Sequence, residues 1–245
     1  MSVQAYKVST QGKLQLSKNF IVEEFACRDS RGRLVSDDVL IEEQNVRWLQ
    51  AERDFFGRPV YIGSAYRTPE RNDAIGGADG SHHITGKADD HDVGSTGPIG
   101  SGNLIHPRLV CMYLQTLTPR PGGIGLYIYP DGTNWVHVDS GPLGKYWFDS
   151  NPTSGGYQYF DSFLPVLRPQ TANWKYKFEA EVAQKMLAKL GMYHGAIDGK
   201  WGKESAAACL AFQKIVFINP SDQDGLCGPM TFASLFRKVG HWVEE

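Results

Sequence analysis

The stretch SHHITGKADDHDV, residues 81–93, holds three histidines and three aspartates. His83 and Asp90 are seven positions apart, and Gly86 between them would let the chain fold back. If a strand begins at Ala88, Ala88 and Asp90 share one face of it. The side chains of His83 and Asp90 can then meet. Histidine and carboxylate are both zinc ligands, so the stretch indicates a metal site. A polar loop with incidental charges is the alternative reading.

The segment WVHVDS, residues 135–140, offers a third ligand. In a strand, Val136 and Val138 would share one face, while His137 and Asp139 would point into a cleft on the other. Two imidazoles and one carboxylate, with a fourth position left to water, form the ligand set of a catalytic zinc site. Calcium prefers oxygen ligands and would not select histidines. Spacing alone leaves the zinc site and the solvated loop both open.

Periodicity and turn signals predict the elements around these residues. Apolar residues at helical spacing predict a helix capped by Ser36, with Asp37 and Asp38 in its first turn, that ends at Gly57. The Gly, Pro, Asn and Asp content of 67–80 predicts a loop. The other expected elements are a strand at 60–65, a helix after Pro107, and strands at 123–129 and 135–140 joined by a turn at 130–132. Together they predict an antiparallel α+β domain, residues 1–150.

The remainder of the chain has a different pattern. Residues 151–174 are rich in Pro, Ser, Gly, Tyr and Gln without an apolar period, which predicts a linker or an extended tail. Residues 175–245 have helical periodicity and contain an internal repeat, DGKWGKES at 198–205 and DGLCGPMT at 224–231. Each copy is expected to be a turn that leads into a helix.

Composition narrows the possible partners. With 25 Lys+Arg against 27 Asp+Glu, the net charge of -2 gives no basic surface for nucleic acid or an anionic membrane. We see no secretory signal pattern and no apolar stretch long enough to span a membrane, so export would need another route. The four cysteines are expected to be reduced, although a bridge between Cys209 and Cys227 stays open. We expect a monomer.

Four motifs stand in the order typical of one peptidase family. They are SAYRTP at 64–69, S-x-H-x-x-G-x-A-x-D at 81–90, GGIGLY at 122–127 and WVHVD at 135–139. Over about residues 18–148 the chain resembles the zinc D-Ala-D-Ala carboxypeptidases and endopeptidases of the M15 type, which have a hedgehog-like α+β fold. The resemblance implies that zinc is bound by His83, Asp90 and His137.

The same resemblance implies roles for other residues. Arg67 matches an arginine that orients the substrate carbonyl or carboxylate, although a surface salt bridge is the alternative. Ser81 either contacts substrate or caps its loop, and Tyr127 is expected to contact substrate. Many members have a glutamate as general base where this chain has Asn134. Asp139 is then either the base or a residue that orients an imidazole. Weaker base candidates are Asp131 and His82, and the groups expected to be solvated or to support the site are Asp89, His91 and Asp92.

Residues of about 178–237 resemble a small three-helix peptidoglycan-binding domain, through motifs such as LGxYxGxIDGxWG at 190–202. Tyr193 and Trp201 could contact sugar or peptide there, or pack in the core. A peptidase domain tethered to such a module would be a peptidoglycan hydrolase of the bacterial cell wall, similar to a phage endolysin. The alternatives are an L-alanyl-D-glutamate endopeptidase of the same fold and an inactive wall-binding or phage structural protein.

Overall fold

The computed structural model describes residues 2–95, 104–151, 156–169 and 175–242. The chain folds as two compact units, residues 1–161 and 162–245. One part of the segment expected as a linker belongs to the first unit, and another part belongs to the second. Strand β8 (Gln158–Phe160) extends the sheet of the first unit, and Leu167 pairs with Cys227 in the second. Other parts of that segment, 152–155 and 170–174, lie outside the described residues.

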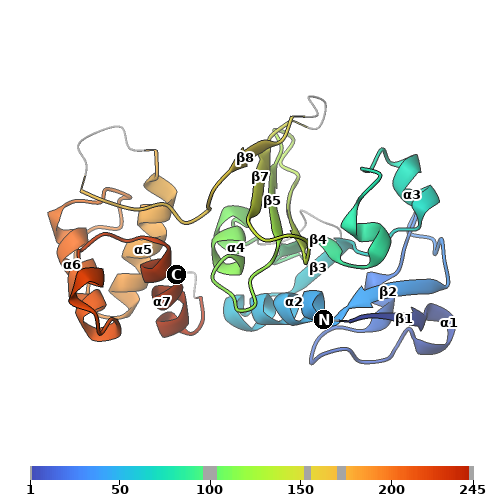
Figure 1. Ribbon diagram of the computed structural model, residues 1–245, viewed down its shortest axis with the longest axis horizontal. Helices are drawn as coiled ribbons and strands as arrows, with labels where there is room; N and C mark the ends of the chain where they lie inside the picture. The colour runs from blue at the N-terminus through green and yellow to red at the C-terminus, as the bar shows by residue number, and fades with distance from the viewer. Residues whose placement is uncertain (1, 96–103, 152–155, 170–174, 243–245) are drawn as a thin grey trace. The chain divides into compact units, whose positions relative to one another are not determined.

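The first unit is built on a six-stranded sheet, whose strands can be followed in Figure 1. Its order is β3 (Val60–Ser64), β4 (Ala88–Val93), β6 (Asn134–Asp139), β5 (Gly123–Ile128), β7 (Lys145–Asp149) and β8. The α+β class is confirmed, but the sheet is mixed, because β5 and β7 run parallel. The last residue of β6 pairs with the first residue of β5. The connection 140–144 is too short to reach the other end of β5. β7 must therefore start beside the start of β5.

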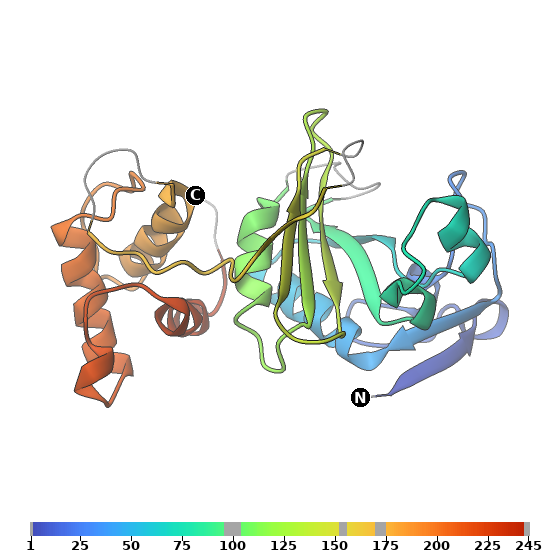
Figure 2. The same cartoon turned by 45° about the horizontal axis from the view of Figure 1, so that its top comes forward.

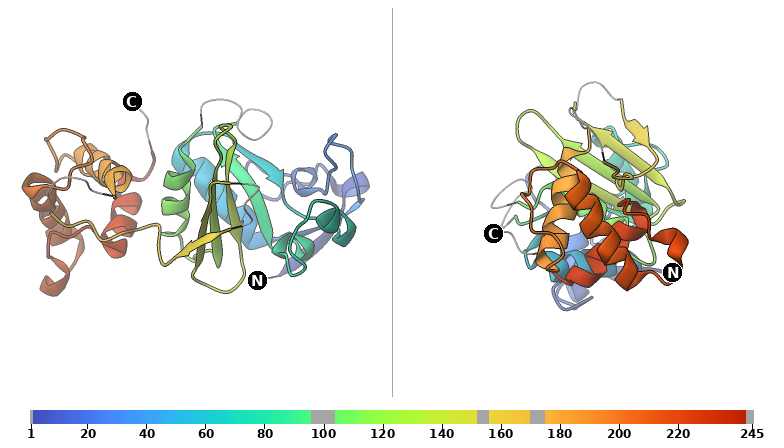
Figure 3. Two further views of the ribbon diagram at one scale, coloured as in Figure 1. Left: turned by 90° about the horizontal axis from the view of Figure 1, so that it is seen from above. Right: turned by 90° about the vertical axis from the view of Figure 1, so that its left-hand side faces the viewer.

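Two helices cover one face of this sheet. Helix α2 (Glu43–Phe56) packs on β3 and β4, and α4 (Pro107–Leu114) packs on β5 and β6. The left view of Figure 3 shows α4 alongside that face. The valines of β6 point to this side and are fully buried, as their alternation predicted. The residues of β6 that alternate with them therefore face the opposite side of the sheet, which is where the candidate ligands lie.

Two predictions of local structure are wrong. Helix α2 begins at Glu43, and the segment before it is strand β2 (Asp38–Glu42), which pairs antiparallel with β1 (Val3–Lys7). Val39 and Ile41 are buried at a period of two, so they belong to a strand and not to the first helical turn. The segment 67–80 also contains a helix, α3 (Pro69–Ala74). The Thr68 side chain caps it by accepting from the Arg71 N–H.

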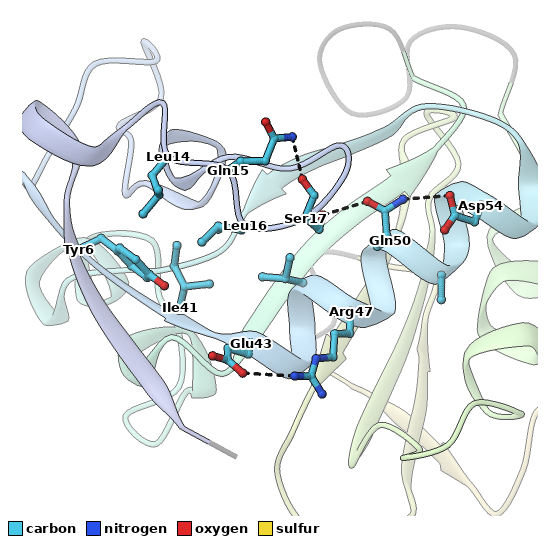
Figure 4. A pocket seen from close by; sticks show the side chains of 12 residues that line it. Tyr6, Leu14, Gln15, Leu16, Ser17, Ile41, Glu43, Arg47, Gln50 and Asp54 are labelled. Atoms are coloured by element: carbon cyan, nitrogen blue, oxygen red, sulfur yellow. Dashed lines mark hydrogen bonds and ion pairs between the residues drawn. The ribbon is translucent and has the colours of Figure 1, made fainter.

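The N-terminal part adds a short helix α1 (Val8–Gln11), a 3-10 helix η1 (Val22–Phe25) and a pocket of about 540 Å³ against α2. Figure 4 shows this pocket, where Ser17 donates to Gln50 and Gln50 donates to Asp54. The candidate site residues do not line it. We therefore assign it no part in the chemistry.

The second unit contains helices α5 (Lys177–Lys189), α6 (Lys203–Val216) and α7 (Pro229–Val239) and a 3-10 helix η3 (Pro220–Asp222). Figure 2 shows α5, α6 and α7 grouped together, coloured from orange to red. α5 packs against both α6 and α7. Among the described residues of the whole chain, we find no helix of the length and apolarity that a membrane span requires. All four cysteines are buried and free, which confirms the prediction of reduced thiols.

The sequence repeat is a structural repeat held by two buried glutamines. Gln184 of α5 donates to the Asp198 carboxylate, the Lys200 carbonyl and the Ser205 hydroxyl, and accepts from the Gly199 N–H at 2.9 Å. One repeat later, Gln213 of α6 makes the same set of bonds. It donates to Asp224, Leu226 O and Thr231 and accepts from Gly225 N–H, at 2.7–3.2 Å. Each turn is thus fixed to the helix that precedes it.

Replacing Gln213 by leucine is expected to destabilise the second unit by roughly 2–4 kcal/mol, because the Gly225 N–H and the Leu226 carbonyl lose their buried partner. Denaturant unfolding followed by circular dichroism measures the change. Lys214→Leu, at the neighbouring exposed position of α6, is the control and should shift the midpoint little. Equal midpoints for Gln213→Leu and wild type would contradict the structural role of this glutamine.

Candidate metal centre

The pairing register aligns one residue from each strand in a row across the sheet. From β3 to β8 this row contains Ser64, Asp90, His137, Gly125, Trp147 and Tyr159. Two of the three predicted ligands, Asp90 and His137, are therefore direct neighbours on adjacent strands. The side chains of such pairs lie about 4.5–5.5 Å apart at Cβ, close enough to share an ion.

The third ligand comes from the short 3-10 helix η2 (His82–Thr85), which precedes β4. Gly86 ends this helix at φ +68°, and a Cβ there would lie 2.3 Å from the Leu40 carbonyl oxygen. Only glycine fits both restrictions. The segment after β3 also holds His83, because the His83 Nδ1–H donates to the Ala65 carbonyl at 2.7 Å and the Arg67 N–H donates to the His83 carbonyl.

The ligand atoms converge on one point. His83 Nε2 and His137 Nδ1 are 3.3 Å apart, and His137 Nδ1 is 2.8 Å from Asp90 Oδ1. Ligand atoms of all three residues lie within 4.8 Å of one another. Two nitrogen ligands of one tetrahedral zinc ion are about 3.3 Å apart at a bond length of about 2.0 Å. The geometry therefore fits a metal held by His83, Asp90 and His137, as the sequence predicted.

Each imidazole is oriented by its other nitrogen. The His83 Nδ1–H is bound to a carbonyl, and the His137 Nε2–H donates to Asp139 Oδ2 at 3.2 Å. Asp139 also accepts from His82 Nδ1 at 2.9 Å and from the Gly141 N–H at 2.7 Å. The Asp139 carboxylate thus lies on the far side of the His137 ring from the converging atoms, where a carboxylate that orients a zinc ligand is found.

Without a metal, the side chains of this cluster strongly shift one another's pKa values. Burial opposes the charged form of His137, but the hydrogen bonds to Asp139 and Asp90 outweigh it and raise the His137 pKa to about 9. Burial likewise opposes ionised Asp139, yet the bond to His137 lowers the Asp139 pKa to about 2. His83 and His137 outweigh burial at Asp90 and hold its pKa well below the usual value. The site therefore contains carboxylates that are fully ionised at neutral pH.

The other predicted residues occupy different places. The Arg67 guanidinium pairs with Asp90 Oδ2, and its Nε–H donates to Ser64 at 2.8 Å, so this arginine belongs to the site and is not a surface ion pair. Ser81 precedes η2, but its side chain makes no capping bond. Tyr127 is mostly buried and stacks on Trp135 with ring centroids 4.6 Å apart. In the second unit, Trp201 is 1% and Tyr193 7% exposed, which leaves little of either ring for a ligand.

Asp89, His91 and Asp92 were expected to be solvated or to support the site, and the structure excludes the solvated alternative. Asp89 and His91 are 0% exposed, because they alternate with Asp90 and point to the face that α2 covers. His91 Nδ1 is 2.6 Å from Asp89, and His91 Nε2 is 2.8 Å from Glu52 of α2, which is also 0% exposed. Burial opposes protonated His91, but the two carboxylates outweigh it and raise its pKa well above the usual value. Asp92 accepts from the Ser95 hydroxyl at 2.6 Å.

Sequence reasoning missed Trp147, whose ring centroid lies 5.1 Å from that of His137. A signal exists in GIG, residues 123–125, because glycines in a strand mark a close approach by another group. Asn134, where related peptidases have glutamate, lies at the start of β6, and its side-chain amide donates to the Gly132 carbonyl at 3.0 Å.

Comparison with known proteins gives one family match, which lies in the first unit. Residues 18–100 match the model of the family described as Peptidase M15. No curated protein and no solved structure gives a match. The matched stretch contains Arg67, Ser81, His83 and Asp90 and ends before His137, which the fold brings to the same point. Residues 18–100 of the first unit are thus similar to the Peptidase M15 family, and the His–Asp–His group that the fold completes fits a zinc site.

Proposed function

We propose that this protein is a zinc peptidase that hydrolyses peptide bonds in the stem peptides or cross-links of bacterial peptidoglycan. The convergence of His83 Nε2, Asp90 and His137 Nδ1 carries the proposal. Zinc bound there would supply an activated water and polarise the scissile carbonyl. The M15 match over residues 18–100 supports peptidoglycan as the substrate class.

The chain's own residues would orient the substrate and handle the proton. Arg67 lies against Asp90 with its guanidinium fork, which suits a substrate carbonyl or carboxylate beside the ligands. His82 is held by Asp139 and remains one-third exposed, so it is accessible as a candidate general base. Asp139 accepts from three donors, which favours a role in orienting His137 and His82 over a role as the base itself.

Replacing Asp139 by asparagine is expected to lower zinc affinity about 10- to 100-fold, because the His137 Nε2–H loses its charged acceptor. Competition with a chromogenic chelator measures this affinity. Asp131→Asn in the β5–β6 turn is the matched control and should bind zinc as wild type does. If Asp139 is instead the general base, Asp139→Asn will lower kcat and leave zinc affinity unchanged.

The second unit is proposed to hold the cell wall and so raise the local concentration of an insoluble substrate. The resemblance of about residues 178–237 to a peptidoglycan-binding domain supports this role. A pull-down of the full chain with purified sacculi tests it. Action at the wall after release by a separate pore, as for a phage endolysin, is proposed by analogy.

Mass spectrometry of muropeptides after digestion, with and without a chelator, tests the catalytic proposal. New products that disappear with the chelator and return with zinc are expected. The product masses also distinguish a cut between D-amino acids, or loss of a terminal D-Ala, from a cut between L-Ala and D-Glu. A chain that binds sacculi without forming products would be the inactive wall-binding protein that Asn134 allows.

A further inference from the structure

The row across the sheet continues past the ligands into aromatic rings. Gly125 stands between His137 and Trp147, and a Cβ at Gly125 would lie 2.5–2.6 Å from atoms of the Trp147 indole. The indole therefore occupies the space that a side chain on β5 would fill. The Trp147 Nε1–H donates to the Tyr127 hydroxyl at 2.9 Å, which fixes the ring over the strand and beside His137.

Two tyrosines extend this surface away from the metal centre. Tyr159 faces Trp147 across the β7–β8 pair, and the centroids of Trp147, Tyr157 and Tyr159 are 6.1–6.5 Å from one another. Tyr157 is 50% and Tyr159 69% exposed. We name these three residues the aromatic platform. These rings gather beside the candidate metal centre and leave much of their surface open to water. Exposed aromatic rings grouped at such a place indicate a binding surface.

We propose that the aromatic platform binds a sugar ring of the glycan strand, next to the stem peptide at the metal centre. A pyranose has an apolar C–H face that packs on an aromatic ring, and hydroxyls that remain in water or bond to the tyrosine hydroxyls. The platform contains no charged side chain, which disfavours the carboxylates and amines of the peptide as its ligand. Its continuity with the ligand row matches a substrate in which sugar and peptide are covalently joined.

This inference rests on the proposed function, and a binding measurement tests it without hydrolysis. Isothermal titration of the full chain with a β-1,4-linked N-acetylglucosamine tetrasaccharide should show binding. Tyr159→Leu and Tyr157→Leu, which keep apolar bulk but lose the ring face, should each weaken it roughly 3- to 10-fold, while Tyr159→Phe retains it. Leu143→Ala, at a position whose exposure (67%) is close to that of Tyr159, is the control. The proposal would be overturned if wild type did not bind the tetrasaccharide, or if both leucine variants bound it as tightly as wild type does.

Three further readouts complete the test. Thermal unfolding checks that each variant is folded, and the Trp147 indole N–H signal, assigned from Trp147→Phe, should shift when wild type is titrated with the tetrasaccharide. On substrates, Tyr159→Leu should lower the ratio of kcat/KM for a sugar-bearing muropeptide to that for the free stem peptide, through KM. An unchanged ratio argues against the platform. Absence of hydrolysis with intact sugar binding would instead refute the proposed peptidase alone.

Discussion

Replacing His137 by alanine is expected to lower hydrolysis of muropeptides about a thousandfold or more. Within the described residues the imidazole supplies one of three converging ligand atoms, and metal activation of water and carbonyl would contribute several kcal/mol to the transition state. Zinc content by atomic emission and product formation by mass spectrometry measure the two parts of this effect. Both should fall together, because His137 acts through the metal.

The matched control for this variant is His241→Ala, an exposed histidine of the second unit whose contact uses its backbone carbonyl. It should retain full zinc content and activity. Activity that survives in zinc-loaded His137→Ala would refute the assignment of this centre. Loss of zinc without loss of hydrolysis would place the chemistry elsewhere in the chain.

Replacing His91 by alanine is expected to destabilise the first unit by about 3–5 kcal/mol. Glu52 and Asp89 are fully buried and face this imidazole from α2 and β4, so its removal leaves two buried carboxylates without their cationic partner. Urea unfolding followed by tryptophan fluorescence measures the loss. The exposed ion pair between Glu43 and Arg47 provides the control, because Glu43→Gln should barely move the midpoint.

The same cluster gives a pH test. The folded-state pKa of His91 is raised, because the two carboxylates outweigh burial, so its stabilisation is fully present below the unfolded pKa of about 6.5 and is lost as pH rises through the folded pKa. Wild-type stability should therefore decline above about pH 6.5, and His91→Gln should show a smaller decline. The raised pKa of His137 acts in the same direction, so the difference between the two proteins is the readout. Parallel pH curves would contradict a protonated His91.

Much of the site could be predicted because its information is local. Strand alternation in WVHVDS places His137 and Asp139 on one face, and the glycine after His83 allows the return toward Asp90. The structure confirms these placements and the strands that carry them. The helix start at 43 could not be recognised, because Val39 and Ile41 fit a strand and the first turn of a helix almost equally well over so few residues.

The predictions that failed concern features that depend on contacts between residues distant in sequence. Asp89 and His91 look like solvated groups until α2 is placed over them, and nothing near Glu52 in the sequence indicates that its carboxylate is buried beside an imidazole. The parallel pairing of β7 depends on the short connection from β6. Trp147 reaches His137 only because β5 presents glycine between them, a relation that exists across three strands and in no single segment.

The row that aligns Asp90 with His137 makes the metal centre a reporter of strand alignment. A shift of β6 against β4 by one residue would bring a valine opposite Asp90 and carry His137 to the helix-covered face, while most of the secondary structure persisted. A refolding chain could thus regain its circular dichroism before it regains zinc. Zinc uptake during refolding is therefore the signal that separates correctly aligned molecules from those that have merely formed a sheet.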